Sequence, residues 1–248
     1  MTLRAPSGRA ATGDSAGMVA ARLAVQEAGH FDPLTVALAE EAHTVAGSGV
    51  SLILDVGAGT GHHLAGVLET VPQARGIAVD ASRDASRRAA RAHPRIAAVR
   101  GDVWQQIPLL EASVDLAFSV FAPRNGAELA RVVRPGGTLV VVTPAPDHLH
   151  ELAPLHTVSV DPVKAQRLQR QLIQGFRPGR VRRIVWTLTL TRRETEAVLS
   201  MGPAGLHLRP DLTARLGALR EPVMVTASVD VRTFRRRGSA QAVAAARC

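Results

Sequence analysis

Cysteine is nearly absent from this sequence: the one copy, Cys248, occupies the last position. The chain can form no internal disulfide, and a zinc site built from cysteines is excluded, so we expect no metal. No apolar run approaches the ~20 residues that a membrane-spanning helix needs, and residues 1–17 lack the apolar segment of a secretory signal. We therefore expect a cytoplasmic protein with no membrane partner.

Aromatic residues and lysine are also scarce. Aromatics make up 3% of the chain and tyrosine is missing, which disfavours a pocket for an aromatic metabolite. Lysine occurs once, at Lys164, so arginine supplies nearly all of the cationic side chains behind a net charge of +9. Because arginine favours planar, two-pronged contacts with phosphate, nucleic acid is a candidate partner. A GC-rich genome would produce the same bias, so charge alone leaves both explanations open.

Short apolar runs alternate with helical patterns from residue 50 onward. Such runs are typical of parallel strands buried on both faces. Strands are expected at 50–56, 75–81, 95–102, 113–123 and 138–144. Helices are expected between them at 62–71, at 82–93 and from Asn125 to a stop at Pro135 and Gly136. Two longer alternating stretches, 182–191 and 223–234, are expected to pair antiparallel and finish the sheet. The pattern predicts a doubly wound α/β sheet that binds its ligand beyond the carboxyl ends of its strands.

The chain is expected to divide into four parts. Residues 1–13 predict a disordered lead-in and residues 238–248 a flexible tail. Residues 14–48 predict an N-terminal helical segment, with Asp14 and Ser15 as candidate caps, and residues 49–237 are expected to form the main domain.

Three glycines, Gly57, Gly59 and Gly61, lie within five residues between the first strand and the first helix of the main domain. Glycine permits positive φ angles and leaves no Cβ in the way, so this loop, which includes Ala58, can bring its backbone close to a ligand. A glycine-rich loop by itself does not identify the ligand, because dinucleotide sites have similar loops.

Three acids at neighbouring strand ends make the ligand more specific. Asp80 can accept hydrogen bonds from both ribose hydroxyls of an adenosine ligand. Asp102 can accept from an adenine amino group while the Val103 amide donates to the ring. Asp55 precedes the loop, where a carboxylate disfavours a pyrophosphate and favours an ammonium or sulfonium. Each acid taken singly is also explained as a helix cap; together they favour a cationic adenosine ligand, and S-adenosyl-L-methionine has that chemistry.

A resemblance to class I S-adenosylmethionine-dependent methyltransferases is carried by "LDVGAGTGHHL", the acids after it and "RPGGTLVVVTP". The resemblance implies a Rossmann-like, seven-stranded sheet with an antiparallel last strand. It also implies a set of cofactor-binding residues: Asp55, Gly57, Ala58, Gly59, Gly61, His62, Asp80, Ala81, Asp102, Val103 and Val120.

A narrower resemblance is carried by "DSAGMVAARLAVQEAGHFDPL", "FAPRNGAELARVVRPGG", "TPAPDHLHEL" and "LSMGP". These segments are similar to 23S rRNA (guanine-N1)-methyltransferases, particularly the actinobacterial branch associated with resistance to tylosin- and mycinamicin-type macrolides. The likeness spans about residues 12–234. It implies methylation of a guanine in a 23S rRNA hairpin loop, and a homodimer. Members of this family usually begin with a zinc module of four cysteine or histidine ligands, which this sequence lacks; this puts the RNA target in doubt.

The residues expected to contact the target base follow the fourth and fifth strands. Phe121 is a candidate for stacking on the base and Pro123 for shaping the loop, although core packing also explains Phe121. Methylation at N1 of guanine requires removal of a proton. Asp147 and His148 are the candidates for receiving it, because histidine titrates near neutrality and a carboxylate can bond the base edge. A helix cap equally explains Asp147.

Clusters of arginine are expected to hold the RNA backbone: Arg87, Arg88 and Arg91; Arg177, Arg180, Arg182 and Arg183; and Arg235–Arg237. Met18, Val19 and Arg22 are candidates for a lid over the cofactor. Two other functions stay open: a small-molecule methyltransferase of the same fold, and a protein that binds S-adenosylmethionine without catalysis.

Overall fold

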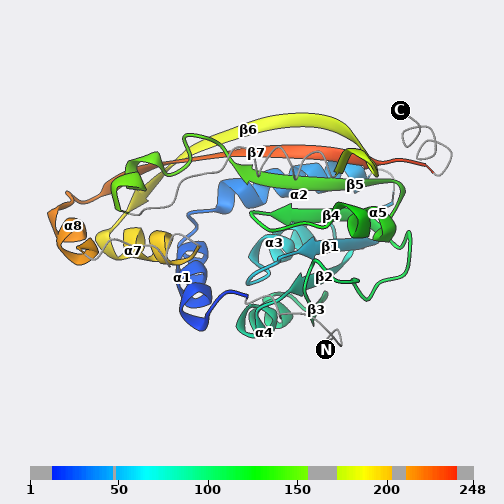
Figure 1. Ribbon diagram of the computed structural model, residues 1–248, viewed down its shortest axis with the longest axis horizontal. Helices are drawn as coiled ribbons and strands as arrows, with labels where there is room; N and C mark the ends of the chain where they lie inside the picture. Colours follow the sequence, from blue (N-terminus) through cyan, green and yellow to red (C-terminus); the bar gives the residue numbers. More distant parts are fainter. Residues whose placement is uncertain (1–12, 47–48, 156–171, 203–210, 239–248) are drawn as a thin grey trace.

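A seven-stranded sheet runs through the centre of the protein (Figure 1). The computed structural model describes residues 13–46, 49–155, 172–202 and 211–238. The strand order is β3-β2-β1-β4-β5-β7-β6, and β7 runs antiparallel to both of its neighbours. The strands are β1 (Leu52–Val56), β2 (Arg75–Asp80), β3 (Ile96–Arg100), β4 (Val114–Val120), β5 (Val133–Pro144), β6 (Phe176–Leu190) and β7 (Val223–Arg236). The predicted doubly wound fold with an antiparallel last strand is confirmed.

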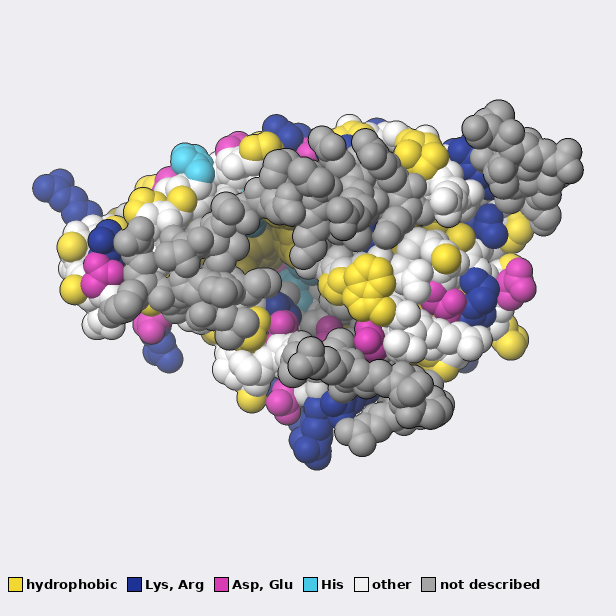
Figure 2. Space-filling model, in the orientation of Figure 1, with side chains coloured by type: hydrophobic (Ala, Val, Ile, Leu, Met, Phe, Trp, Pro, Cys, Tyr) yellow, Lys and Arg dark blue, Asp and Glu magenta, His cyan; other side chains and the backbone are white. Residues whose placement is uncertain are grey.

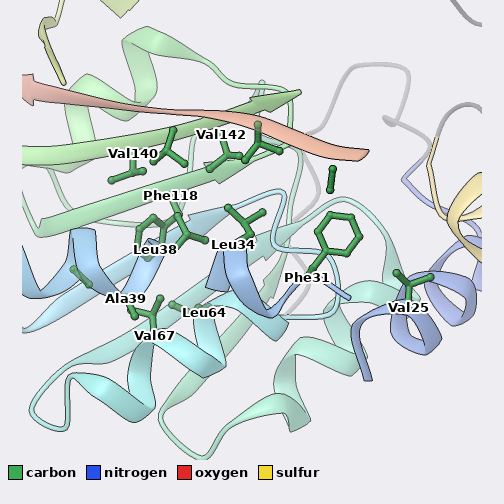
Figure 3. Close-up of a cluster of buried hydrophobic side chains, with 14 of the residues drawn as sticks. Val25, Phe31, Leu34, Leu38, Ala39, Leu64, Val67, Phe118, Val140 and Val142 are labelled. Carbon is green, nitrogen blue, oxygen red and sulfur yellow. The ribbon is translucent and has the colours of Figure 1, made fainter. Parts of the chain in front are cut away.

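Helices cover both faces of this sheet. They are α1 (Ala16–Glu27), α2 (Asp32–Ala46), α3 (His62–Thr70), α4 (Arg83–Ala92), α5 (Gly126–Val132), the 3-10 helix η1 (His150–Leu155), α7 (Arg192–Ser200) and α8 (Leu212–Ala218). On one face, Leu34 and Leu38 of α2 and Leu64 of α3 pack against Phe118 of β4 and Val140 of β5 (Figure 3). On the other, Leu129, Ala130 and Val132 of α5 join a second apolar cluster with residues of β1, β4 and β5.

Serine side chains begin two of the helices that border the site. Ser15 accepts a hydrogen bond from the Met18 amide at the start of α1, so it is confirmed as the cap from the two candidates. Ser82 accepts from the Ala85 amide at the start of α4 and donates to the Asp14 carbonyl oxygen at 2.7 Å. The second bond ties the segment before α1 to the end of β2, because one hydroxyl both donates and accepts.

Helix α5 ends slightly before Pro135 and Gly136, where the sequence predicts its end. The helix ends at Val132, and Val133 already pairs with Val114 of β4. Arg134 is held in this extended segment by a 2.6 Å bond from its Nε to Asp115 Oδ1, while Asp115 Oδ2 accepts from the Leu52 amide at 2.9 Å. This ion pair, which local sequence does not reveal, favours the strand over a longer helix.

The long strands β6 and β7 pair antiparallel from Phe176↔Arg236 to Leu190↔Val223, as expected. β7 lies between β5 and β6, so it reaches the loop that follows β5: the Ala145 amide donates to Ser228 O at 3.0 Å. No helix in the described part of the chain is long and apolar enough to cross a membrane. Most of the expected lead-in and tail, residues 1–12 and 239–248, lies outside the described residues.

Candidate active site

A cavity of about 480 Å³ lies at the carboxyl ends of the central strands, and Figure 2 shows it as a hollow with acidic and histidine side chains visible inside. It brings together most of the predicted site residues: Asp55, Gly57, Ala58, Gly59, Asp80, Ala81, Asp102, Val103, Val120, Phe121, Pro123 and His148. Three predicted residues, Gly61, His62 and Asp147, are not part of its lining. Twelve of the fifteen predicted site residues therefore line one cavity, and their roles in binding or catalysis stay predictions.

The glycine loop between β1 and α3 has the backbone conformation that its sequence predicts. Gly57 has a φ of 68°, and a Cβ there would lie 2.4 Å from the Cβ of Ala122. Gly59 has a φ of 57°, and its amide donates to Asp80 Oδ2 at 2.9 Å. Gly61 is the N-cap of α3 with a φ of 80°, and a Cβ there would lie 2.9 Å from the Cα of Ala89. Gly57 and Gly59 therefore shape the cavity, whereas Gly61 allows α3 to approach α4.

Asp80 connects the loops after β1 and β2. Its two carboxylate oxygens accept from the Gly59 amide at 2.9 Å and from the Ser82 amide at 2.8 Å. Burial raises the pKa of Asp80, and these two amides partly offset the effect. Each carboxylate oxygen can accept a further bond, so Asp80 can still bind the two ribose hydroxyls expected from the sequence.

Asp55 is the most unusual group in the cavity. Its side chain is 3% exposed, and its Oδ1 has no hydrogen-bond partner. Burial and the nearby charge of Asp80 raise the pKa of Asp55 to about 8. A buried carboxyl without a partner is costly in the free protein. A cation in the cavity would supply the missing partner, so the site has the chemistry for an ammonium-bearing ligand.

Arg22 carries positive charge to the cavity wall beside Gly59, since a Cβ on Gly59 would lie 3.1 Å from its Nη1. Its Nη1 lies 2.5 Å from Asp14 Oδ2, and its Nη2 donates to Met201 O at 2.7 Å. These contacts join α1 to the end of α7. Of the three residues expected to form a lid, Arg22 lines the cavity, whereas Val19 is buried in the core and Met18 is not part of the lining.

His63, and not His62, is the histidine of α3 that faces the cavity. Its Nδ1 is 2.8 Å from Thr35 Oγ1, and burial lowers its pKa to about 3. The His62 Nε2 instead lies 3.8 Å from Asp32 Oδ1. Successive side chains on a helix point about 100° apart, so only one of two adjacent histidines can face the ligand. The sequence pattern contains no signal for which one does.

Trp104 is a cavity residue that the sequence analysis missed. It follows Asp102 and Val103, its amide donates to Asp102 Oδ1 at 3.0 Å, and its side chain is 48% exposed. The sequence held a signal for it, since the chain has only two tryptophans and one of them lies two residues after Asp102, the acid that follows β3.

Phe121 forms the mouth of the cavity at the end of β4. It has a φ of 51° and is 44% exposed, although it is a large apolar residue. Its ring stacks on His148 with centroids 5.7 Å apart and packs edge-on against buried Phe31 at 6.5 Å. A non-glycine residue in the left-handed region is strained, and such strain is concentrated at functional sites. An exposed, strained aromatic supported by two rings is suited to stacking on a planar ligand.

His148 is fixed in its orientation by β7. The amide of Ser228 donates to His148 Nδ1 at 3.1 Å. Burial lowers the pKa of His148 to about 4, so the ring is neutral at physiological pH. Asp147, the other predicted proton acceptor, has an exposed side chain, and its carbonyl oxygen accepts from the His150 amide at 3.4 Å. Only one of the two candidates for the base edge is therefore in the cavity.

The comparisons with known proteins agree with this geometry. Residues 53–137 match the model of the Methyltransferase domain family. The chain is 46% identical to a 23S rRNA (guanine(748)-N(1))-methyltransferase of Streptomyces fradiae, over 86% of this chain and 76% of the relative. It is equally 46% identical to a Micromonospora griseorubida protein named as a 23S rRNA (guanine-N(1)-)-methyltransferase, over 95% of this chain and 83% of the relative.

The chain belongs to the 23S rRNA (guanine-N1)-methyltransferase family. Among solved structures, it is similar to a Haloferax volcanii methyltransferase in complex with the Trm112 methyltransferase activator. That similarity has a TM-score of 0.53 at 18% identity and covers 94% of this chain and all of the other, which supports the fold alone.

The cofactor of this methyltransferase is S-adenosylmethionine, and the cavity residues are compatible with it. Asp55 would hold the ammonium group, Asp80 the ribose, and Asp102 with the Val103 amide the adenine. Bound there, the cofactor supplies a methyl group activated by a sulfonium sulfur. In the described ranges no group of three or more histidine, cysteine, aspartate or glutamate side chains is arranged to hold a metal ion.

Proposed function

We propose that this protein methylates N1 of one guanine in a hairpin loop of 23S rRNA. The observation that carries the proposal is Phe121, an exposed and strained aromatic ring at the mouth of a cavity that contains an unpaired buried carboxylate. A nucleobase that leaves its stack can lie on such a ring. N1 lies on the Watson–Crick edge, so the target must be unpaired, and a loop guanine meets that requirement.

The target base would reach the site through the open mouth. Trp104 and Phe121 both line the cavity and both are about half exposed, in a chain with seven aromatic residues, two Trp and five Phe. Aromatic side chains that are open to solvent beside a cationic surface are typical of proteins that bind single-stranded nucleic acid. This arrangement favours RNA over a small apolar metabolite, which would require an enclosed apolar pocket.

The cationic surface that supports the proposal is α4. Arg83, Arg87 and Arg91 recur every fourth residue and so share one side of the helix. They are exposed, and within the described residues none has an ion pair or hydrogen bond. In Figure 2, dark blue side chains gather over α4, at the lower edge of the molecule and below the hollow. Free guanidinium groups beside the active site are available for RNA phosphates.

The arginines of β6 support RNA binding less than the sequence suggested. Arg182 is paired with Glu40 at 2.6 Å, and Arg183 with Asp230 at 2.9 Å. Arg180 likewise contacts Glu41. These groups already neutralise acids of α2 and β7, so they gain less from a phosphate than the free arginines of α4.

The proposal is tested by incubating the protein with S-adenosylmethionine labelled in the methyl group and unmodified 23S rRNA. Label in RNA, together with a reverse-transcriptase stop at one loop guanine, is the expected result, since a methyl group on N1 blocks Watson–Crick pairing. Asp55→Asn serves as the matched inactive control. Label in small molecules of a cell extract, or binding without transfer, would favour the alternative functions instead. Light scattering of the same sample tests the homodimer that the family resemblance implies.

A further inference from the structure

We propose that His148 acts as a hydrogen-bond donor to O6 of the target guanine, and not as the base that removes the N1 proton. The inference rests on the proposed function for the identity of the target base. It depends on three structural features of His148: its bond to β7, its free nitrogen and its stacking on Phe121.

The bond to β7 fixes the tautomer of the ring. A backbone N–H can only donate, so the Ser228 amide, 3.1 Å from Nδ1, requires that Nδ1 be an unprotonated acceptor. A neutral imidazole carries one proton, which must then lie on Nε2. The loop that carries His148 is held in place by two further β7 contacts: Ala145 N donates to Ser228 O at 3.0 Å and Leu149 N to Thr226 O at 2.7 Å. A ring flip would therefore break the bond from the Ser228 amide to Nδ1.

The Nε2–H group is available to a ligand. His148 lines the cavity, and in the described part of the chain no group accepts a hydrogen bond from its Nε2. Asp147 is the charged neighbour that acts on the ring, and its effect is smaller than that of burial, which lowers the pKa of His148. A ring that is neutral and already protonated on Nε2 has no lone pair on that nitrogen with which to accept a proton.

Stacking on Phe121 sets the plane of the donor. The planes of the two rings differ by 29°. A base that stacks on Phe121 beside the imidazole would thus lie nearly parallel to the imidazole. The Nε2–H group lies in the plane of its own ring, so it can then reach an oxygen at the edge of the base with good geometry. The edge that carries N1 has O6 next to it. Adenine presents an amino group there, so two donors would meet, and the same contact would select guanine.

The donor would also assist the reaction. N1 forms its bond to the methyl carbon while the carbon–sulfur bond breaks and its electron pair stays on sulfur; the N1 proton passes to water at the mouth of the cavity. As N1 loses its proton, negative charge builds on O6. A fixed donor that points at this oxygen stabilises the charge in the transition state, and the removal of one such donor typically costs about 10²–10³ in kcat.

The tautomer is tested first, without RNA. Nitrogen-15 NMR of the histidine-labelled protein between pH 6 and 8, with the His148 signals assigned from the spectrum of His148→Gln, should show a neutral ring protonated on Nε2. A ring protonated on Nδ1 would overturn the proposal. The NMR experiment remains decisive even if the protein modifies a different RNA base. It therefore separates a failure of this proposal from a failure of the proposed function.

The role is tested by two substitutions on the RNA substrate. His148→Gln keeps an N–H donor near the position of Nε2 but cannot act as a base, and should retain single-turnover methylation within about tenfold of wild type. His148→Ala lacks the donor and should lose about 10²-fold or more. An equal loss of methylation rate in both variants, with unchanged S-adenosylmethionine affinity by calorimetry, would support a role of His148 as a base. It would contradict its role as a donor. Wild-type activity should also show no histidine ionisation between pH 6 and 8.

Discussion

The two ends of the cavity are held together in different ways. At the cofactor end, the loops after β1 and β2 are joined within one β-α-β unit: the Gly59 and Ser82 amides, 21 and 2 positions away, both bond to Asp80. At the base end, Phe121 and His148 are positioned by distant parts of the chain, namely Phe31 and Ser228. The cofactor end is thus specified by a motif, and the base end by the fold.

This difference has a functional consequence. One cofactor serves many methyltransferases, so a locally encoded site can be kept while the loops after β4 and β5 change. The target base is chosen by groups whose orientation depends on β7, a strand formed late in the chain. We therefore expect substitutions at the cofactor end to affect S-adenosylmethionine binding and those at the base end to affect RNA methylation alone.

The largest effect is expected for Asp55→Asn, which keeps the shape of the side chain and removes its charge. Loss of the one buried, unpartnered carboxylate oxygen described in the cavity should weaken S-adenosylmethionine binding by about 100-fold, within the range for truncating a buried charge pair. Isothermal titration calorimetry measures the change. A loss below about threefold would mean that Asp55 does not hold the ammonium group.

The same substitution should have a second, opposite effect on the free protein. The pKa of Asp55 is raised from 3.8 to about 8, so the folded state holds this proton more tightly than the unfolded chain. The contribution of Asp55 to stability is then lost as pH rises from about 4 to about 8. The Asp55→Asn variant has no such proton to lose. Its free energy of unfolding in urea, compared with that of wild type, should therefore increase between pH 5 and pH 8. Parallel pH dependence of the two proteins would contradict the raised pKa.

A smaller effect is expected for Gly57→Ala, with Gly136→Ala as the matched control. Both glycines have positive φ, 68° and 73°, so both substitutions carry the left-handed penalty of about 1–2 kcal/mol. Only Gly57 also faces a neighbour, since its Cβ would lie 2.4 Å from that of Ala122, whereas a Cβ at Gly136 meets nothing within 4 Å. S-adenosylmethionine affinity should fall about tenfold in Gly57→Ala and stay unchanged in Gly136→Ala. Equal S-adenosylmethionine affinities in the two variants would show that the loop tolerates the Cβ added in Gly57→Ala.

The candidate cofactor-binding residues were named from local signals, and their roles stay predictions. Turn glycines and strand-end acids lie within a few residues of the elements that position them, and Asp55, Gly57 and Asp80 are all in the cavity. The choice of His63 over His62 was not predictable, because it depends on how α3 is rotated against Thr35 of α2.

The candidates at the base end, Phe121 and His148, were named from residue type, and their roles stay predictions. His148 was expected to receive a proton, and nothing near it in the sequence reveals the amide of Ser228, 80 residues later, that occupies its Nδ1. The early end of α5 was not predictable for the same reason, since the partner of Arg134 is Asp115 on a neighbouring strand.

A moderate effect confined to RNA is expected for Phe121→Ala. Removal of the ring should raise the KM for RNA by about 10- to 100-fold, since stacking contributes about 1–3 kcal/mol per base. Phe121→Trp keeps an aromatic face and should stay within a few fold of wild type, and S-adenosylmethionine affinity should be unchanged in both. Steady-state methylation kinetics provide the measurement. Equal KM values for the two variants would mean that the ring does not stack on the base.

The smallest effect is expected for the double substitution Arg87→Gln/Arg91→Gln on α4. Because these arginines are exposed and have no partner in the described structure, each can bind one phosphate, and the slope of log affinity against log salt should fall by about one for each arginine replaced. The matched control is Arg182→Gln/Arg183→Gln, whose side chains are already paired with Glu40 and Asp230. Filter binding of the RNA hairpin across a salt series measures both slopes. A reduced slope in the β6 control with an unchanged slope in the α4 variant would place the RNA on β6, beyond the base end of the cavity, and would reverse the assignment of the cationic surface.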